Sequence, residues 1–323
     1  MEKGLLIDAG RKFWSMDFLK DTIKLMNRLS MTHLQLHFSE NLGFRIEYPG
    51  LSLTDNTVSS YSLADLAELV DFARQNGIEL VPSFDSPGHL AGILTSYPEF
   101  ALQKADGSRE LSALDVTNPE ACAFIFAIYE RLAELFPSKI FHIGGDEFIP
   151  FDQIEQYPSL QGNLDAYVTY INRLVEILSA QGKTCRIWND GFFRQSPESN
   201  TQLTDLSEVC YWTNWDKNMA PVKTWLDKGY SVINYCDNYL YYVLGEAAGY
   251  NYPTAEKLEN WSPELFSGGQ KLSSEEIQQV KGCYFSVWSD IPDAKSEDEV
   301  FSDLTKLIPV FVKKINRLVI KPV

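Results

Sequence analysis

Short apolar runs recur along the chain and alternate with longer segments in which apolar positions repeat at a helical period. Each short run is nearly continuous in apolar character, which is typical of a β-strand that is covered on both faces. Eight such runs predict strands over residues 4–9, 33–38, 78–84, 140–144, 184–189, 209–212, 231–235 and 282–288.

The longer segments carry residues that begin and end helices. Ser62 and Asn118 each precede an amphipathic segment that they can cap, and Pro119 suits a first helical position. Gly77 and Gly182 follow two of the segments and come directly before strands, as in short αβ connections. The pattern predicts helices over residues 17–30, 63–76, 119–136, 163–181, 218–228 and 296–317.

This alternation of strands and helices defines a fold class. Strands that alternate with helices favour parallel pairing, and eight such units favour a closed barrel over an open sheet. We therefore predict an α/β fold, a single (β/α)8 TIM barrel that spans residues 1–323 as one domain. The longest irregular connection, residues 239–281, follows a strand and is therefore expected on the face that carries the active site.

Charge and composition narrow the range of partners. The net charge is −16, whereas a nucleic-acid-binding protein needs a basic surface. The same negative field disfavours anionic membranes and polyanionic substrates, so a neutral or cationic small molecule fits better. The sequence contains no membrane-spanning apolar stretch and begins without a recognisable secretory signal, which leads us to expect a cytoplasmic protein. A domain of a larger secreted or surface protein is the alternative, because its sequence would show the same features. The five cysteines form no CxxC pair, and we interpret them as small buried residues of a reducing compartment.

Polar and aromatic residues gather at the predicted C-terminal ends of the strands, where a barrel of this kind builds its active site. Carboxylates predominate among them, together with tryptophans and one arginine. In strand order, they are Asp8, Arg11, His37, Glu40, Asp85, His89, Asp146, Glu147, Trp188, Asp190, Trp212, Tyr235, Asp237, Tyr239, Trp288 and Asp290.

The segment His-Ile-Gly-Gly-Asp-Glu at residues 142–147 is the most informative of these strand ends. Two glycines allow a sharp turn or a close approach to a ligand. Adjacent carboxylates repel each other, so we expect one of Asp146 and Glu147 to have a raised pKa, as suits a general acid. The alternative interpretation is a solvated acidic turn without a catalytic role.

The spacing of these two carboxylates also bears on the mechanism. In most retaining glycosidases, two carboxyl groups about 5 Å apart face the anomeric carbon from opposite sides. Neighbours at one strand end approach from the same side, so one of them is poorly placed as the nucleophile. A group of the substrate, such as a 2-acetamido oxygen, could then attack instead.

A metal-dependent hydrolase is the main competing interpretation. The chain has only four histidines, at positions 33, 37, 89 and 142, and contains no H-E-x-x-H motif. We therefore expect neither a catalytic metal nor another cofactor, although a magnesium site made of carboxylates alone stays open. The sequence also lacks a G-x-S-x-G elbow, a Walker loop and a G-x-G-x-x-G motif.

The segments around three strand ends resemble the catalytic barrel of the β-N-acetylhexosaminidases, glycoside hydrolase family 20. The similar segments are His142–Glu147, the Asp-x-x-Arg arrangement of Asp8 and Arg11, and the Pro-Gly-His turn that ends at His89. The resemblance implies exo-acting, substrate-assisted, retaining hydrolysis of terminal β-linked GlcNAc or GalNAc through an oxazolinium intermediate. The implied partner is a glycan with a terminal N-acetylhexosamine.

The resemblance also implies a role for individual residues. Glu147 would be the acid and base, and Asp146 would orient the acetamido group. Tyr239 would hydrogen-bond its carbonyl, and His89, paired with Glu40, would tune the pKa of Glu147. For the sugar itself, the resemblance implies contacts from Arg11, His37, Trp188, Trp212, Trp288, Asp290 and Tyr241.

Three segments depart from the family pattern. Tyr241 stands where the family has aspartate in Tyr-Leu-Asp, and Asp290 stands where it has glutamate in Trp-x-Glu. The strand-two segment, residues 37–41, carries Glu40 and Asn41 in place of two aspartates. The alternative to an enzyme is a non-catalytic glycan-binding barrel. Some barrels of this type pair through their helices, so a homodimer is one assembly to test.

Overall fold

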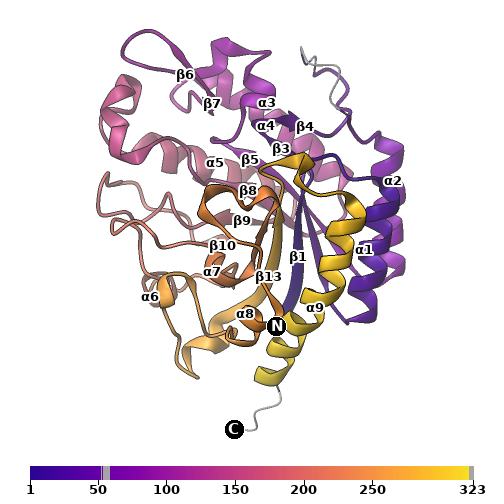
Figure 1. Ribbon diagram of the computed structural model, residues 1–323. Coiled ribbons are helices and arrows are strands. Elements are labelled where there is room, and N and C mark those ends of the chain that lie inside the picture. The colour runs from indigo at the N-terminus through magenta and orange to yellow at the C-terminus, as the bar shows by residue number, and fades with distance from the viewer. Residues whose placement is uncertain (52, 54–58, 320–323) are drawn as a thin grey trace.

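The computed structural model describes residues 1–51, 53 and 59–319 of the chain. Its centre is a closed barrel of parallel strands, which confirms the predicted fold class (Figure 1). The barrel strands, in order around the barrel, are β1 (Glu2–Asp8), β2 (His33–His37), β5 (Glu79–Ser86), β8 (Ile140–Gly144), β9 (Thr184–Trp188), β10 (Ser207–Tyr211), β11 (Val232–Asn234) and β13 (Val280–Trp288).

Pairing between the first and last strands closes the barrel. Leu5 of β1 is in register with Leu34 of β2 on one side and with Phe285 of β13 on the other. Because all these strands run in parallel, their carboxyl ends meet at one rim.

Helices cover the outside of the barrel, and Figure 1 shows α1, α2 and α9 side by side on one flank. Their starts follow from capping: the Ser15 hydroxyl accepts a hydrogen bond from the N–H of Phe18, and Ser62 forms a capping box with Asp65. The longer helices are α1 (Met16–Arg28), α2 (Leu63–Gln75), α4 (Pro119–Leu135), α5 (Asp165–Ala180) and α9 (Glu297–Val319).

The helix expected over residues 218–228 is shorter in the structure. Helix α6 (Val222–Asp227) begins only after Pro221. Asn218 instead lies in a turn, where its N–H donates to the carboxylate of Asp216. Proline restricts the residue before it to extended backbone, so the helix cannot extend back through this point.

Short elements fill the connections at the carboxyl rim. The 239–281 connection, which we expected to be irregular, contains α8 (Ala255–Glu259) and begins within α7 (Asp237–Leu240). It also contains β12 (Tyr241–Val243), which pairs with the end of β13. At the end of the barrel opposite the N-terminus in Figure 1, the chain adds α3 (Ala91–Leu94) and the strand pairs β3 (Ser39–Glu40) with β4 (Gly43–Phe44) and β6 (Ala101–Gln103) with β7 (Arg109–Leu114).

The core has two parts, as expected for strands that are covered on both faces. Outside the barrel, side chains such as Leu5 and Ile7 belong to the large cluster that includes the buried helix residues. Inside it, Leu6, Trp188 and Tyr284 belong to a separate cluster.

An ionic network closes the amino-terminal end of the barrel interior. Arg186, which is fully buried on β9, bonds to Glu2 at 2.8 Å, to Glu208 at 2.9 Å and to the hydroxyl of Tyr284 at 2.7 Å. Residues of three other strands, β1, β10 and β13, thereby contact one buried cation. The polar contacts needed to keep that charge buried are all present.

No helix in the part of the chain that the structure describes has the length and apolar character that a membrane span requires. The five cysteines are free thiols, and four of them are buried.

Candidate active site

A cavity of about 460 Å³ opens at the carboxyl rim of the barrel. It collects side chains from loops that follow most of the barrel strands. Apart from His37 and Tyr239, every residue to which the family resemblance gave a role lines it. The lining residues are Arg11, Glu40, His89, Asp146, Glu147, Trp188, Trp212, Trp215, Asp237, Tyr241, Val243, Ala248, Tyr250, Trp288 and Asp290.

The turn after β8 presents two adjacent carboxylates to this cavity. Gly144 and Gly145 have φ angles of 77° and 91°, which glycine adopts readily. A side chain at Gly144 would also lie 2.6 Å from the carboxylate of Asp85, so the turn needs glycine there. The Tyr167 hydroxyl donates to the carbonyl oxygen of Gly145 and fixes the turn from below.

His89 connects these carboxylates to a third one. Its Nε2 lies 3.4 Å from oxygens of both Asp146 and Glu147, and its Nδ1 lies 2.8 Å from Oε1 of Glu40. Burial alone would lower the pKa of His89, but Glu40 and Asp146 raise it well above its ordinary value. Burial alone would raise the pKa of Glu40, but His89 and Arg11 lower it to about 2. His89 is therefore held as a cation among acids.

This cation changes the expected behaviour of the acidic pair. We predicted that repulsion would raise the pKa of Asp146 or Glu147, but the pKa of Glu147 is lowered, mainly by its hydrogen bond with His89. The side chain of Glu147 is also 52% exposed. For Glu147 the prediction was wrong, because it did not include the positive charge of His89 beside the two carboxylates.

Two buried acids next to the pair, Asp85 and Asp190, do have raised pKa values. Burial, together with the carboxylate of Asp146, raises the pKa of Asp190 to about 7 and that of Asp85 well above its ordinary value. Both were among the strand-end residues, but nothing in their own segments distinguished them from other loop acids. Their importance depends on contacts with residues distant in sequence.

Arg11 lies at one side of the cavity and is held in place by two acids. Its guanidinium bonds to Asp8 at 2.9 Å and to Glu40 at 2.6 Å, and it lies 5.6 Å from the ring centre of Trp288. Asp8 also accepts the N–H of Ser289 at 3.0 Å, so it ties the first strand to the last. The sequence had placed Asp8 at this rim without giving it a role.

Aromatic rings form the walls. Trp212 and Tyr241 lie parallel, with ring centres 6.0 Å apart. Tyr241 is 5.8 Å from Trp288, which in turn is 6.1 Å from Trp188. Trp215 lines the same cavity but is 71% exposed, and neither it nor Tyr250 was singled out from the sequence.

The structure does not bring Tyr239 to the cavity. Tyr239 lies on α7, packs against the outer core cluster, and has its ring centre 6.0 Å from Nζ of Lys257. The helical turn ends at Leu240, and Tyr241 then pairs with Ser286 of β13. This change from helix to strand points Tyr241, rather than Tyr239, toward the cavity.

His37 is the second predicted residue that does not reach the cavity. It is 0% exposed, with its ring 5.4 Å from that of Trp288 and its Nε2 3.7 Å from Asp85. Burial lowers its pKa. His37 therefore supports the cavity from beneath and cannot contact a ligand in this conformation.

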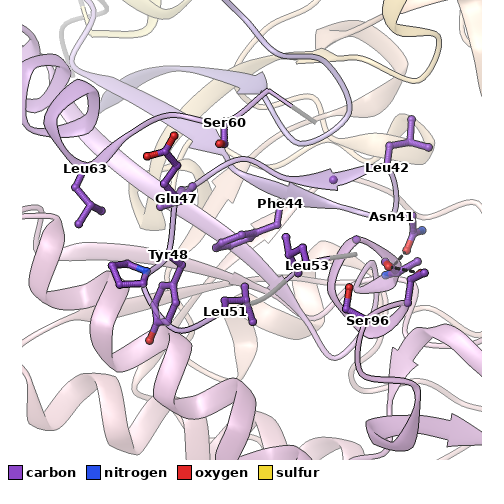
Figure 2. Close-up of a pocket in the computed structure, with 16 residues that line it drawn as sticks. Asn41, Leu42, Phe44, Glu47, Tyr48, Leu51, Leu53, Ser60, Leu63 and Ser96 are labelled. Carbon is purple, nitrogen blue, oxygen red and sulfur yellow. Dashed lines mark hydrogen bonds between the residues drawn. The ribbon is translucent and has the colours of Figure 1, made fainter. Parts of the chain in front are cut away.

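A larger cavity of about 1120 Å³ adjoins the first. The two share His89, Glu147, Trp212 and Trp215, so they meet at Glu147. A third cavity, of about 650 Å³, lies beside β4 and α3 and is drawn in Figure 2. Leu42, Phe44, Tyr48 and Leu51 line it, and among its described lining residues Glu47 is the sole charged one, so it does not offer comparable chemistry.

Within residues 1–51, 53 and 59–319, no cluster of three or more His, Cys, Asp or Glu side chains has the arrangement of a metal site.

The family model of the glycosyl hydrolase family 20 catalytic domain matches residues 3–305. A lacto-N-biosidase from Bifidobacterium bifidum is 27% identical over 77% of this chain, which spans 23% of that protein. A β-hexosaminidase from Akkermansia muciniphila is 23% identical over 90% of this chain, which spans 64% of that protein. The chain therefore covers less than two thirds of either relative.

Solved structures agree on the fold. Dispersin B superposes with a TM-score of 0.80 at 24% identity, and the match covers 98% of this chain and 99% of that one. A catalytic module of the pneumococcal exo-β-D-N-acetylglucosaminidase StrH superposes with a TM-score of 0.79 at 22% identity, over 97% and 82% of the two chains. Given the family match over residues 3–305 and the acidic pair at the rim of the barrel, this chain belongs to glycosyl hydrolase family 20.

Proposed function

We propose that the protein hydrolyses terminal, non-reducing, β-linked N-acetylhexosamine residues of glycans, with retention of configuration and with the 2-acetamido group of the substrate as nucleophile. One observation carries this proposal: Asp146 and Glu147 leave the same turn, line the same cavity and lie at equal distance, 3.4 Å, from Nε2 of His89.

Two acids on one side of the cavity cannot divide the work as acid and opposite-face nucleophile. Two other cavity carboxylates, Glu40 and Asp237, are already engaged. Glu40 is bound by His89 and Arg11, and Asp237 accepts hydrogen bonds from Ser267 and Tyr250. These engagements favour a nucleophile that belongs to the substrate.

Asp146 is suited to hold the acetamido group. Its Oδ1 is buried and has no hydrogen-bond partner among the described residues. A buried acceptor without a donor is costly, and an acetamido N–H would satisfy it. The negative charge would then stabilise the oxazolinium cation as it forms.

Glu147 is placed to protonate the glycosidic oxygen and later to activate water. Its half-exposed side chain lies where the two cavities meet, so a leaving group would extend into the larger one. A bound substrate would exclude water from Glu147, and burial of a carboxyl raises its pKa toward the range a general acid needs.

The walls of the smaller cavity suit one N-acetylated sugar. The parallel rings of Trp212 and Tyr241, with Trp188 and Trp288, offer apolar faces for the ring and the acetamido methyl. We assign the hydrogen bond to the acetamido carbonyl to Tyr241, because Tyr239 lies outside the cavity. Arg11 would bind ring hydroxyls.

The relatives support this substrate class. They include the Akkermansia muciniphila β-hexosaminidase and a β-N-acetylhexosaminidase from Cellulomonas fimi that is 27% identical over 68% of this chain, which spans 43% of that protein.

The proposal is tested with three p-nitrophenyl glycosides: the N-acetyl-β-glucosaminide, the N-acetyl-β-galactosaminide and the plain β-glucoside. We expect turnover of at least one of the first two, little action on the third, and competitive inhibition by a thiazoline mimic of the intermediate. Hydrolysis of the plain glucoside at a comparable rate would contradict substrate assistance.

Glu147→Gln separates an enzyme from a non-catalytic glycan-binding barrel. We expect this variant to lose turnover by about 10²-fold or more while still binding the product sugar. Glu130→Gln, at an exposed position on α4, is the control. Binding without turnover in the wild type would favour the non-catalytic alternative, and loss of turnover on treatment with a chelator would favour a metal-dependent hydrolase.

A further inference from the structure

We propose that Asp190 is a positioning residue that holds the acid Glu147 and the sugar-binding wall at Trp212 in one fixed relation. This inference rests on the proposed function, because it concerns how that site is assembled.

Each carboxylate oxygen of Asp190 accepts a hydrogen bond from a different part of the site. Its Oδ2 accepts the backbone N–H of Glu147 at 2.9 Å, and its Oδ1 accepts the indole N–H of Trp212 at 3.0 Å. The residue is 1% exposed. Both oxygens are thus used by N–H donors, and a carboxylate is the one side-chain group of this length that accepts at both ends.

Glu147 needs such support because its backbone is unusual. Its φ angle is 42°, in the left-handed region that non-glycine residues seldom adopt. A conformation of this kind persists only where surrounding contacts maintain it. The bond to Asp190 holds the N–H of Glu147, and the Tyr167 hydroxyl holds the Gly145 carbonyl two residues earlier.

The other carboxylate oxygen of Asp190, Oδ1, contacts the loop after β10. The side chain of Asn189 holds this loop as well. Asn189 accepts the backbone N–H of Trp212 at 2.8 Å and donates to the carbonyl of Thr213 at 2.9 Å. Arg194 in turn donates to the carbonyl of Asp190 at 2.9 Å. The segment after β9 therefore joins the acid on one side to the aromatic wall on the other.

This arrangement predicts a specific kinetic signature. A displaced acid slows the departure of leaving groups that must be protonated, but it matters little for leaving groups that depart as stable anions. A purely structural defect would slow both kinds of substrate alike. An alkyl or disaccharide N-acetyl-β-glucosaminide has a leaving group that must be protonated. A dinitrophenyl N-acetyl-β-glucosaminide has a leaving group that departs as a stable anion.

The experiment measures kcat and KM for both substrates in the wild type and in Asp190→Asn, which places an N–H donor against one of the two donors. We expect the fold-loss of kcat for the alkyl or disaccharide substrate to be about 10 times, or more, that for the dinitrophenyl substrate. Equal falls in both would overturn the assignment.

Trp212→Phe keeps the inference testable if Asp190→Asn does not fold. This variant removes the indole N–H but leaves the bond between Asp190 and Glu147, so KM should rise while the ratio of the two kcat values stays within about twofold of the wild type. A change in that ratio as large as the one expected for Asp190→Asn would also overturn the assignment. Wild-type enzyme that hydrolyses neither substrate would instead contradict the proposed function.

Discussion

His89 Nδ1 lies 2.8 Å from Glu40 Oε1, and this contact favours the protonated, positively charged form of the imidazole within the acidic site. Glu40 holds the imidazole as a cation, and the imidazolium then faces Asp146 and Glu147. Three carboxylates can therefore share a small volume with little mutual repulsion. The histidine is a buried counter-charge as well as a neighbour of the acid.

Glu40→Gln should shift the pH dependence of hydrolysis. Without the carboxylate, the pKa of His89 falls, so the imidazole loses its proton at a lower pH. We expect the alkaline limb of kcat/KM to move to lower pH. The measurement is a pH–rate profile of both enzymes, with Glu130→Gln as the control, and an unmoved alkaline limb would contradict this role of Glu40.

The same pair predicts a pH window for stability. The pKa of Glu40 is about 2 in the folded protein against an ordinary value of 4.5, so its contribution is present above pH 4.5 and is lost as the pH falls toward 2. The pKa of His89 is raised above 6.5, so its contribution is complete below pH 6.5 and is lost as the pH rises through the folded value.

The difference in free energy of unfolding between wild type and Glu40→Gln should therefore be largest between pH 4.5 and 6.5. Urea denaturation across this range measures it. A difference that grows steadily as the pH falls below 4.5 would show that the pair does not contribute in this way.

Tyr241→Phe and Tyr239→Phe form a matched pair. Tyr241 lines the cavity and Tyr239 does not, so removal of the Tyr241 hydroxyl should lower kcat by about 10²-fold, as for loss of one donor to the developing charge. Tyr239→Phe should stay close to wild type. Kinetics on the p-nitrophenyl N-acetylglucosaminide decide between them, and the reverse result would restore the role first given to Tyr239.

Asp146→Asn should lower the rate of hydrolysis far more than it weakens substrate binding. The carboxylate is needed mainly as positive charge develops on the acetamido group, so kcat should fall by about 10²–10³-fold with a modest change in KM. Asp71→Asn, in an exposed ion pair on α2, is the control. A variant that keeps nearly full rate would show that the acetamido group is not the nucleophile.

Arg186→Met should destabilise the barrel without changing the chemistry at the other end. Breaking a buried ion pair leaves the carboxylates of Glu2 and Glu208 without their shared partner and costs about 3–5 kcal/mol. Arg173→Met removes an exposed pair on α5 and should cost about 0–1 kcal/mol. Urea denaturation separates them, and equal losses would mean that the buried network contributes little.

The sequence by itself predicted the barrel and the acidic pair. The strands are continuous apolar runs, the helices carry local caps such as Ser62 and Asn118, and both signals lie within a few residues. Asp146 and Glu147 could be identified because they are neighbours in the chain, next to two glycines in a single turn.

Other features depended on tertiary structure. The cavity receives Tyr241 rather than Tyr239 because a helical turn ends at Leu240 and the next residue joins β13. Asp190 becomes important only where the ends of β8, β9 and β10 meet, and the pKa of Glu147 is lowered because His89 arrives from the end of β5. Local patterns report the period and capping of one segment. Side-chain direction, burial and charge compensation arise from segments distant in sequence, so only the packed barrel determines them.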